Sequence, residues 1–305
     1  MMKIAICIRG SLRTWDVCKH TIFKMYDFSK CSVVPEVDWF FDIWDNDSFT
    51  YYELDENLET IKAERVVSLL DADELEPKIR KDFEKANAHL TNFNLHKFDP
   101  DLNPAESFLK LVNLANLSKR MYELSGNFKY DVVLQIRPDV CTYYENDDAK
   151  MDYVRESIIE SRHHYILNYE KNLEEKVPVF NDVQLNDRYN TWVSDVPGIP
   201  DTIFYGKSQI IDLLSNAYLY LKNKDEPFVF PHASLYLFLQ KYGVIMNSFT
   251  PEWKIVRNMK IAGKYDYQKY VDNPELVTDP QSDFSNSLRS CSSIWYDLFD
   301  RHKII

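Results

Sequence analysis

The run Tyr130–Ile136 constrains the fold of this chain more than any other feature. It is short and mostly apolar, and it ends abruptly in Arg137-Pro138-Asp139. Ile4–Ile8 is a second short apolar run, which ends at Arg9. Runs of this length and composition are typical of strands that are buried on both faces of a sheet. The sequence therefore predicts two central strands with both faces covered.

Around these two runs the pattern alternates between strand and helix. A loop at Gly10 leads into a helical segment that ends near Phe28, and Pro104–Gly126 is a long amphipathic helix. Its predicted apolar stripe consists of Phe108, Leu111, Val112, Ala115, Met121 and Leu124. The other predicted strands are Val37–Trp44, Arg65–Leu70, Tyr165–Tyr169, Thr202–Tyr205 and Val244–Phe249. The other predicted helices are Asp71–Ala88, Met151–Ser161, Ser208–Leu221 and His232–Tyr242. This order predicts an α/β core with an elaborated C-terminal half.

The composition is that of a globular protein with no general affinity for polyanions. The chain has 305 residues, of which 45% are hydrophobic, and a chain of this length can bury about 75% of its unfolded surface. Its 48 acidic and 36 basic side chains give a net charge of −12, so we expect no nucleic acid partner. A small phosphorylated ligand needs only a few well-placed arginines and is compatible with this charge.

The cysteines and the hydropathy pattern predict where the protein is found. The five cysteines form no C-x-x-C pair, so we expect free thiols in a reducing compartment. No run of about 18 apolar residues occurs, so we expect no transmembrane segment. The expected location is the cytoplasm, or the host cytoplasm if the source is a virus.

Charged and polar residues are grouped at the carboxyl ends of three predicted strands. Ligands of open α/β sheets bind beyond the carboxyl ends of the strands. Arg9–Arg13 combines a glycine, which permits a tight turn, with two arginines that can clamp a diphosphate. Asp42–Asp47 contains Asp45, which can accept a hydrogen bond from a ribose or a base. In Arg137-Pro138-Asp139, the carboxylate can hold Mg²⁺ or Mn²⁺ and the arginine can face a phosphate.

Each of these ends also has a structural interpretation. Arg9–Arg13 can be a solvated turn between a strand and a helix, and Asp42–Asp47 can be a turn favoured by its Asp and Asn residues. Arg137 can form a structural salt bridge with a nearby acid.

In this order and spacing, the three ends resemble a group of glycosyltransferase-like proteins found in bacteria and large DNA viruses. The resemblance rests on a G-x-x-R loop at Gly10–Arg13, a strand ending in W-D at Val37–Asp45 and a strand ending in R-P-D at Tyr130–Asp139. Two weaker matches are Asp201–Gly206 and Pro231–Leu235.

The resemblance implies a GT-A-like, Rossmann-like α/β fold with a mixed sheet and flanking helices. Residues 1–150 would form the half that binds the nucleotide sugar, residues 151–271 the half that binds the acceptor, and residues 272–305 a C-terminal tail that is irregular or partly mobile. The implied partners are a nucleotide-sugar donor and a glycan or a lipid- or protein-linked acceptor.

The resemblance also implies roles for individual residues. The loop residues Arg9, Gly10, Ser11 and Arg13 would bind the donor diphosphate, with Arg137 beside them, and Asp42 and Asp45 would lie on the nucleoside side. Asp139 would be the ligand of a divalent cation, Mn²⁺ or Mg²⁺. This chain has Arg-Pro-Asp where the family has the metal-binding motif Asp-x-Asp, so one carboxylate ligand is replaced by an arginine.

The function that the sequence predicts is transfer of a sugar from a nucleotide-diphosphate donor to a hydroxyl acceptor. An inverting enzyme needs a general base, for which Asp201 is the first candidate and His232 the second. Two alternatives stay open. One is a nucleotide-dependent phosphoryl or nucleotidyl transferase, although the sequence has no P-loop motif. The other is a catalytically silent module that binds a sugar or a nucleotide.

Overall fold

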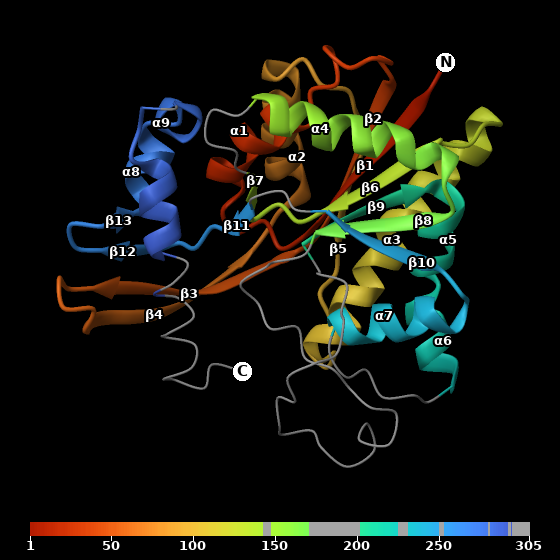
Figure 1. The fold of residues 1–305 in the computed structure, drawn as a ribbon. Helices are drawn as coiled ribbons and strands as arrows, with labels where there is room; N and C mark the ends of the chain where they lie inside the picture. The colour runs from red at the N-terminus through yellow and green to blue at the C-terminus, as the bar shows by residue number, and fades with distance from the viewer. Residues whose placement is uncertain are drawn as a thin grey trace.

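Figure 1 shows the computed structural model, which describes residues 1–142, 148–170, 202–224, 231–249, 253–279, 281–291 and 294. The central element is a seven-stranded mixed sheet with the strand order β10-β8-β9-β6-β1-β2-β5. Its strands are β1 (Lys3–Gly10), β2 (Glu36–Trp44), β5 (Leu90–His96), β6 (Val132–Ile136), β8 (Ile166–Glu170), β9 (Ile203–Lys207) and β10 (Ile245–Phe249). Strands β1, β2, β5 and β6 are parallel, whereas β9 runs antiparallel to β6 and β8. The predicted α/β class with a mixed sheet is confirmed.

Helices cover both faces of this sheet (Figure 1). On one face lie α1 (Trp15–Met25), α2 (Ala72–Lys85) and α4 (Asp148–Glu160). On the other lie α3 (Pro104–Gly126), α5 (Ser208–Ser215), α6 (Ala217–Lys224) and α7 (Pro231–Lys241). Alternate residues of β1 serve the two faces. Ile4, Ile6 and Ile8 pack toward α1, while Ala5 and Cys7 pack toward α3. The unbroken apolar character of β1 follows from this burial on both sides.

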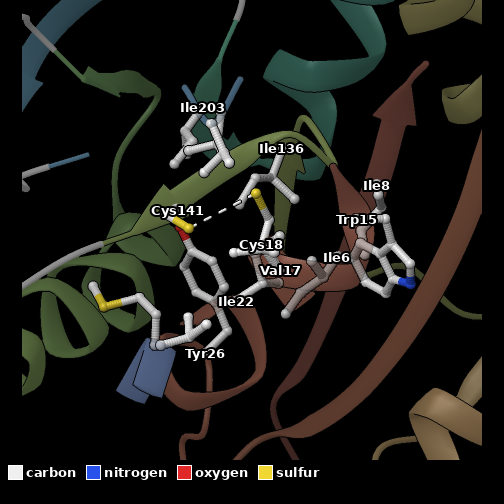
Figure 2. Packing of buried hydrophobic residues seen from close by; sticks show 14 of the residues in the cluster. Ile6, Ile8, Trp15, Val17, Cys18, Ile22, Tyr26, Ile136, Cys141 and Ile203 are labelled. Carbon is white, nitrogen blue, oxygen red and sulfur yellow. Dashed lines mark hydrogen bonds between the residues drawn. The ribbon is translucent and has the colours of Figure 1, made fainter. Parts of the chain in front are cut away.

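The packing between α1 and the sheet is shown in Figure 2, where strand isoleucines meet one face of the helix. Cys18 of α1 lies 3.7 Å from Cys141, measured between the two sulfur atoms. All five cysteines are free thiols, as their spacing predicts.

Two smaller sheets flank the central one. One pairs β7 (Val140–Thr142) with β11 (Trp253–Ile255) in antiparallel fashion. The other has the order β13-β12-β3-β4 and consists of β3 (Asn46–Leu54), β4 (Thr60–Leu69), β12 (Met259–Ile261) and β13 (Tyr265–Asp266). The short helices α8 (Tyr267–Asp272) and α9 (Glu275–Thr278) follow β13, and a 3-10 turn, η1 (Ser161–His163), follows α4.

Several details differ from the sequence-based expectation. Strands β3 and β5 were not expected, because their sequences NDSFTYYEL and LTNFNLH are rich in polar residues. The expected apolar stripe of α3 is correct at Leu111, Val112 and Ala115, but Met121 and Leu124 are 65% and 72% exposed. In the expected tail, residues 281–291 are not irregular. They include a helical run over 284–291, whose Phe284, Leu288 and Cys291 are buried in the core cluster that contains α1.

Candidate functional site

The strand order creates a reversal point between β1 and β6. From β1 the chain proceeds outward to β2 and β5, and then returns through α3 to place β6 on the other side of β1. In open α/β sheets, ligands bind at the carboxyl ends of the two strands that flank such a point. Here those ends are Arg9-Gly10 and Ile136-Arg137, so two of the three polar strand ends meet where a ligand site is expected.

Gly10 brings the loops after β1 and β6 into contact. Its φ of +148° is a backbone conformation that side chains rarely permit, and a Cβ atom built on it would lie 2.9 Å from Cδ of Pro138. Glycine at this position therefore lets Pro138, and with it Arg137 and Asp139, approach the start of the loop that carries Arg13.

Two arginines hold the carboxylate of Asp139. Nε and a terminal nitrogen of Arg137 donate to Oδ1 and Oδ2 at 2.8 and 2.6 Å, and Arg13 donates to Oδ2 at 3.3 Å. Asp139 is only 1% exposed. Its burial would raise its pKa, but the charges of Arg137 and Arg13 hold the pKa of this carboxyl well below its usual range.

Asp47, at the start of β3, fixes the backbone of the same loop. Its Oδ1 accepts the backbone N–H of Arg13 at 2.9 Å, and Arg13 has a left-handed φ of +38°. Burial raises the pKa of Asp47, although the N–H and the charge of Arg13 act in the opposite direction. The segment Asp42–Asp47, which the structure divides between β2 and β3 and not into a single turn, thus reaches the first strand end through Asp47.

Arg257 joins the site from a distant part of the chain. It follows β11, and the N–H of the preceding Val256 donates to the carbonyl oxygen of Asp139 at 2.9 Å. The hydroxyl of Thr14 donates to the carbonyl oxygen of Val256 at 3.2 Å. Desolvation, together with the charges of Arg13 and Arg137, lowers the pKa of Arg257 to about 10, so it stays positively charged at neutral pH. Sequence reasoning missed Arg257, and a short apolar run that ends at an arginine was the only signal for it.

The resulting arrangement favours an anion. Arg13, Arg137 and Arg257 lie close enough to influence the same carboxylate, and a planar guanidinium group suits the oxygens of a phosphate. Of the two interpretations of Arg137, the structure shows the salt bridge with Asp139, whereas contact with a phosphate stays a prediction.

The residues around Asp139 do not fit a divalent cation. Both carboxylate oxygens already accept hydrogen bonds from guanidinium groups, and a cation placed there would be repelled by Arg13, Arg137 and Arg257. Within the part of the chain that the structure describes, no three His, Cys, Asp or Glu side chains are grouped to hold a metal ion. The neighbouring side chains thus give no support to the expected Mn²⁺ or Mg²⁺ at Asp139.

Arg9 lies in a different environment from Arg13 and Arg137. It is 1% exposed on the α3 face of the sheet, where its Nε donates to Oε1 of Gln135 at 3.1 Å. Its guanidinium carbon lies 4.7 Å from the ring centre of Phe108 and 5.0 Å from that of Phe204. These contacts hold the Arg9 side chain between β1 and α3, whereas Arg13 and Arg137 both contact Asp139.

Asp42 is the register partner of Arg9 on β2 and is fully buried. Its Oδ1 accepts hydrogen bonds from Asn94, His96 and Ser118 at 2.8 to 2.9 Å. Asp45 accepts the backbone N–H of Phe98 at 2.8 Å and so ties the end of β2 to the loop after β5. The contacts of both carboxylates connect β2 to β5 and α3.

For the remaining predicted site residues, the structure gives a position in the chain fold but no contact with the Asp139 cluster, or no description at all. Ser11 is half-buried in the turn between β1 and α1. His232 is the second residue of α7, in the first turn of that helix. Asp201 lies outside the described residues. The structure therefore brings Gly10, Arg13, Arg137 and Asp139 together, without placing either candidate base relative to them.

Comparisons with known proteins do not assign this chain to a family. No protein-family model matches the chain, and no curated protein matches it. Solved structures do match, among them a crystal structure described as a glucose-1-phosphate thymidylyltransferase from Bacillus anthracis in complex with a sucrose. The match covers 84% of this chain and 89% of that one, at 11% identity and a TM-score of 0.38. At this similarity no property of that protein is transferred to this chain. In the described part of the chain, no helix combines the length and the apolar character that a membrane crossing requires.

Proposed function

We propose that this chain is a nucleotide-sugar-dependent glycosyltransferase whose donor diphosphate binds between the carboxyl ends of β1 and β6. The observation that carries the proposal is the grouping of Arg13, Arg137 and Arg257 beside the Gly10 turn at that edge of the sheet. Charge-assisted hydrogen bonds from guanidinium groups to phosphate oxygens are among the strongest that a protein can offer.

The chemistry follows from where charge develops. Transfer breaks the bond between the sugar's anomeric carbon and the diphosphate, and the departing diphosphate gains negative charge. Preorganised positive groups stabilise that charge in the transition state more than in the bound donor. Arg13 and Arg137 are held in place by Asp139, so little reorganisation is needed when the bond breaks.

An acceptor hydroxyl attacks the anomeric carbon, and in an inverting reaction a base removes its proton. Asp201 and His232 remain the two candidates for this base. The sugar and the acceptor are proposed to bind on the side formed by residues 151–271, next to the diphosphate site.

We further propose that the guanidinium groups replace the divalent cation in neutralising the diphosphate. The same anion site would also serve a nucleotidyl transferase or a module that binds without turnover. The reaction products distinguish these functions. Sugar transfer or donor hydrolysis releases a nucleoside diphosphate, nucleotidyl transfer releases pyrophosphate, and a silent module releases neither.

Thermal unfolding in the presence of a panel of nucleoside diphosphates, with Mn²⁺ or with EDTA, tests the site. A ligand at 100 times its Kd stabilises the folded state by about 2.7 kcal/mol. For a chain of 305 residues this corresponds to a rise in Tm of about 4 °C. We expect one nucleotide to produce such a rise in EDTA as well as in Mn²⁺. If no nucleotide raises Tm, the proposed function is wrong, and a rise seen only with Mn²⁺ would contradict cation-independent binding.

Substitutions assign that binding to the guanidinium groups. Arg13→Gln and Arg257→Gln should each reduce the nucleotide-dependent rise in Tm by at least half. Arg80→Gln is the matched control, because Arg80 pairs with Glu76 on the exposed side of α2. It should leave the rise unchanged. Product analysis on donor sugars then separates transferase, nucleotidyl transferase and silent module.

A further inference from the structure

Strand β4 forms an exposed edge of the four-stranded sheet (Figure 1). It pairs with β3 along one side, and within the described residues no strand pairs with its other side. All but one of its ten residues are exposed, including Ile61 at 65%, Val67 at 55% and Leu69 at 81%. A long edge strand with unpaired backbone groups is a template for another strand, and proteins usually shield such edges.

The apolar side chains of β4 lie on the face of the sheet that is otherwise covered. Ala63 is opposite Tyr52 in the β3–β4 register, so the odd-numbered residues from Ala63 to Leu69 share a face with Tyr52. The register shifts at Ile61, where Leu54 is opposite Thr60. Tyr52 and Leu54 are buried in the core cluster. The covered face therefore continues outward onto β4 as an exposed row in which Ala63, Val67 and Leu69 flank Arg65, while Ile61 lies at the register shift.

The charges of β4 favour a second copy of the chain as its partner and favour one register for that pairing. A two-fold axis perpendicular to the sheet can pair two antiparallel copies of β4 only in registers centred on a residue. Centring on Lys62, Glu64 or Arg65 places a charge opposite the same charge, which is unfavourable. Centring on Val66 creates no charge pair, whereas centring on Ala63 places Lys62 of each copy opposite Glu64 of the other.

We propose that β4 is a self-association edge, at which two copies of the chain pair antiparallel about a two-fold axis at Ala63. The pairing extends the four-stranded sheet into a continuous eight-stranded sheet across the dimer. It pairs outer backbone groups on either side of Ala63 and forms two reciprocal Lys62–Glu64 pairs between the copies, in addition to the Lys62–Glu64 pair within each chain. The stem of Arg65 then packs on Ile61 of the other copy. This association is independent of the proposed glycosyltransferase function.

Charge reversal tests the proposal. Sedimentation velocity of the wild-type chain over a concentration series should show a species of twice the 36.2 kDa monomer mass. Lys62→Glu and Glu64→Lys each place two like-charge pairs across the axis and should weaken the dimer by about tenfold or more. An equimolar mixture of the two variants restores both opposite-charge pairs and should form a dimer again. Because the two side chains are 53% and 54% exposed, each variant should keep the Tm of the monomer.

A cysteine cross-link tests the register. Directly opposed residues of an antiparallel pair have Cα atoms about 4.5–5.5 Å apart, within the range that a disulfide spans. Ala63→Cys should therefore give a covalent dimer when oxidised glutathione accepts the two electrons, and Val66→Cys should not. A wild-type chain that stays monomeric, single variants that associate as the wild type does, or a cross-link at position 66 instead of 63 would each overturn the proposal.

Discussion

Replacing Asp139 by asparagine should destabilise the fold, although the side chain keeps its size. The carboxylate is 1% exposed and accepts three hydrogen bonds from Arg137 and Arg13. Asparagine removes the negative charge and turns one acceptor into an NH₂ donor that faces guanidinium donors. Three guanidinium groups, with Arg257 as the third, then remain close together without the carboxylate that they share.

The size of the effect follows from the burial of the pair. Removing one partner of a buried ion pair costs about 3–5 kcal/mol, because the other charge stays buried without compensation. At about 2.1 cal/mol/K of unfolding entropy per residue, a chain of 305 residues should lose about 5–8 °C in Tm. Asp283→Asn is the control, since Asp283 is 62% exposed in its pair with Lys269 and should change Tm by about 1 °C or less.

The pH dependence provides an independent check. The pKa of Asp139 is lower in the folded chain than its ordinary value of 3.8, so the unfolded chain binds the proton first as the pH falls. The stabilisation is therefore complete above about pH 5 and is lost as the pH falls from about 4 toward the folded pKa. The difference in Tm between the wild type and Asp139→Asn should be constant from pH 7 to 5 and should narrow from pH 4 to 3.

Thermal unfolding followed by circular dichroism at each pH measures this difference. A Tm of Asp139→Asn within 1 °C of the wild type at pH 7 would contradict a stabilising role for the Asp139 carboxylate, and so would a Tm difference that does not narrow in acid. For the same reason, Asp139→Ala is a poor test of ligand binding. A loss of binding in that variant would be mixed with a loss of stability, whereas Arg13, whose side chain is 31% exposed, is the better position.

Three further substitutions probe the turn at Gly10 and the packing of α3 against α5. Gly10→Ala should lower the free energy of unfolding in urea by about 1–3 kcal/mol, because a φ of +148° favours glycine and the added Cβ would lie 2.9 Å from Pro138. An unchanged free energy of unfolding would mean that the close approach of the two loops is not required. Lys119→Met should lower the free energy of unfolding by about 3–5 kcal/mol, because Lys119 is fully buried and lies 2.8 Å from Asp212. Lys129→Met should lower it by less than about 1 kcal/mol, because Lys129 is 58% exposed in its pair with the same Asp212. Equal effects of the two lysine variants would contradict the assignment of that energy to burial.

The central strands were predictable because their signal is local. The strands β1, β2 and β6 are buried on both faces, so their sequences are almost continuously apolar. β5 belongs to the same sheet but lies at its edge, where polar residues are tolerated, and its sequence LTNFNLH was not recognised as a strand. The polar buried face of α3 escaped prediction for a related reason. Lys119 and Glu123 are buried there because they pair with each other, and Lys119 also pairs with Asp212 of α5, a partner that no periodicity reveals.

For the candidate site, the local sequence was enough to place Arg9–Arg13 and Arg137–Asp139 at the ends of two buried strands. That placement predicts a shared ligand edge, because the carboxyl ends of neighbouring parallel strands lie at the same side of a sheet. Which charges meet there depends on long-range packing that the local sequence does not contain. This packing turns Arg9 inward between Phe108 and Phe204, since alternate residues of a strand point to opposite faces. It also brings Arg257 to Asp139 through the pairing of β11 with β7, a contact between segments more than 100 residues apart that local sequence cannot encode.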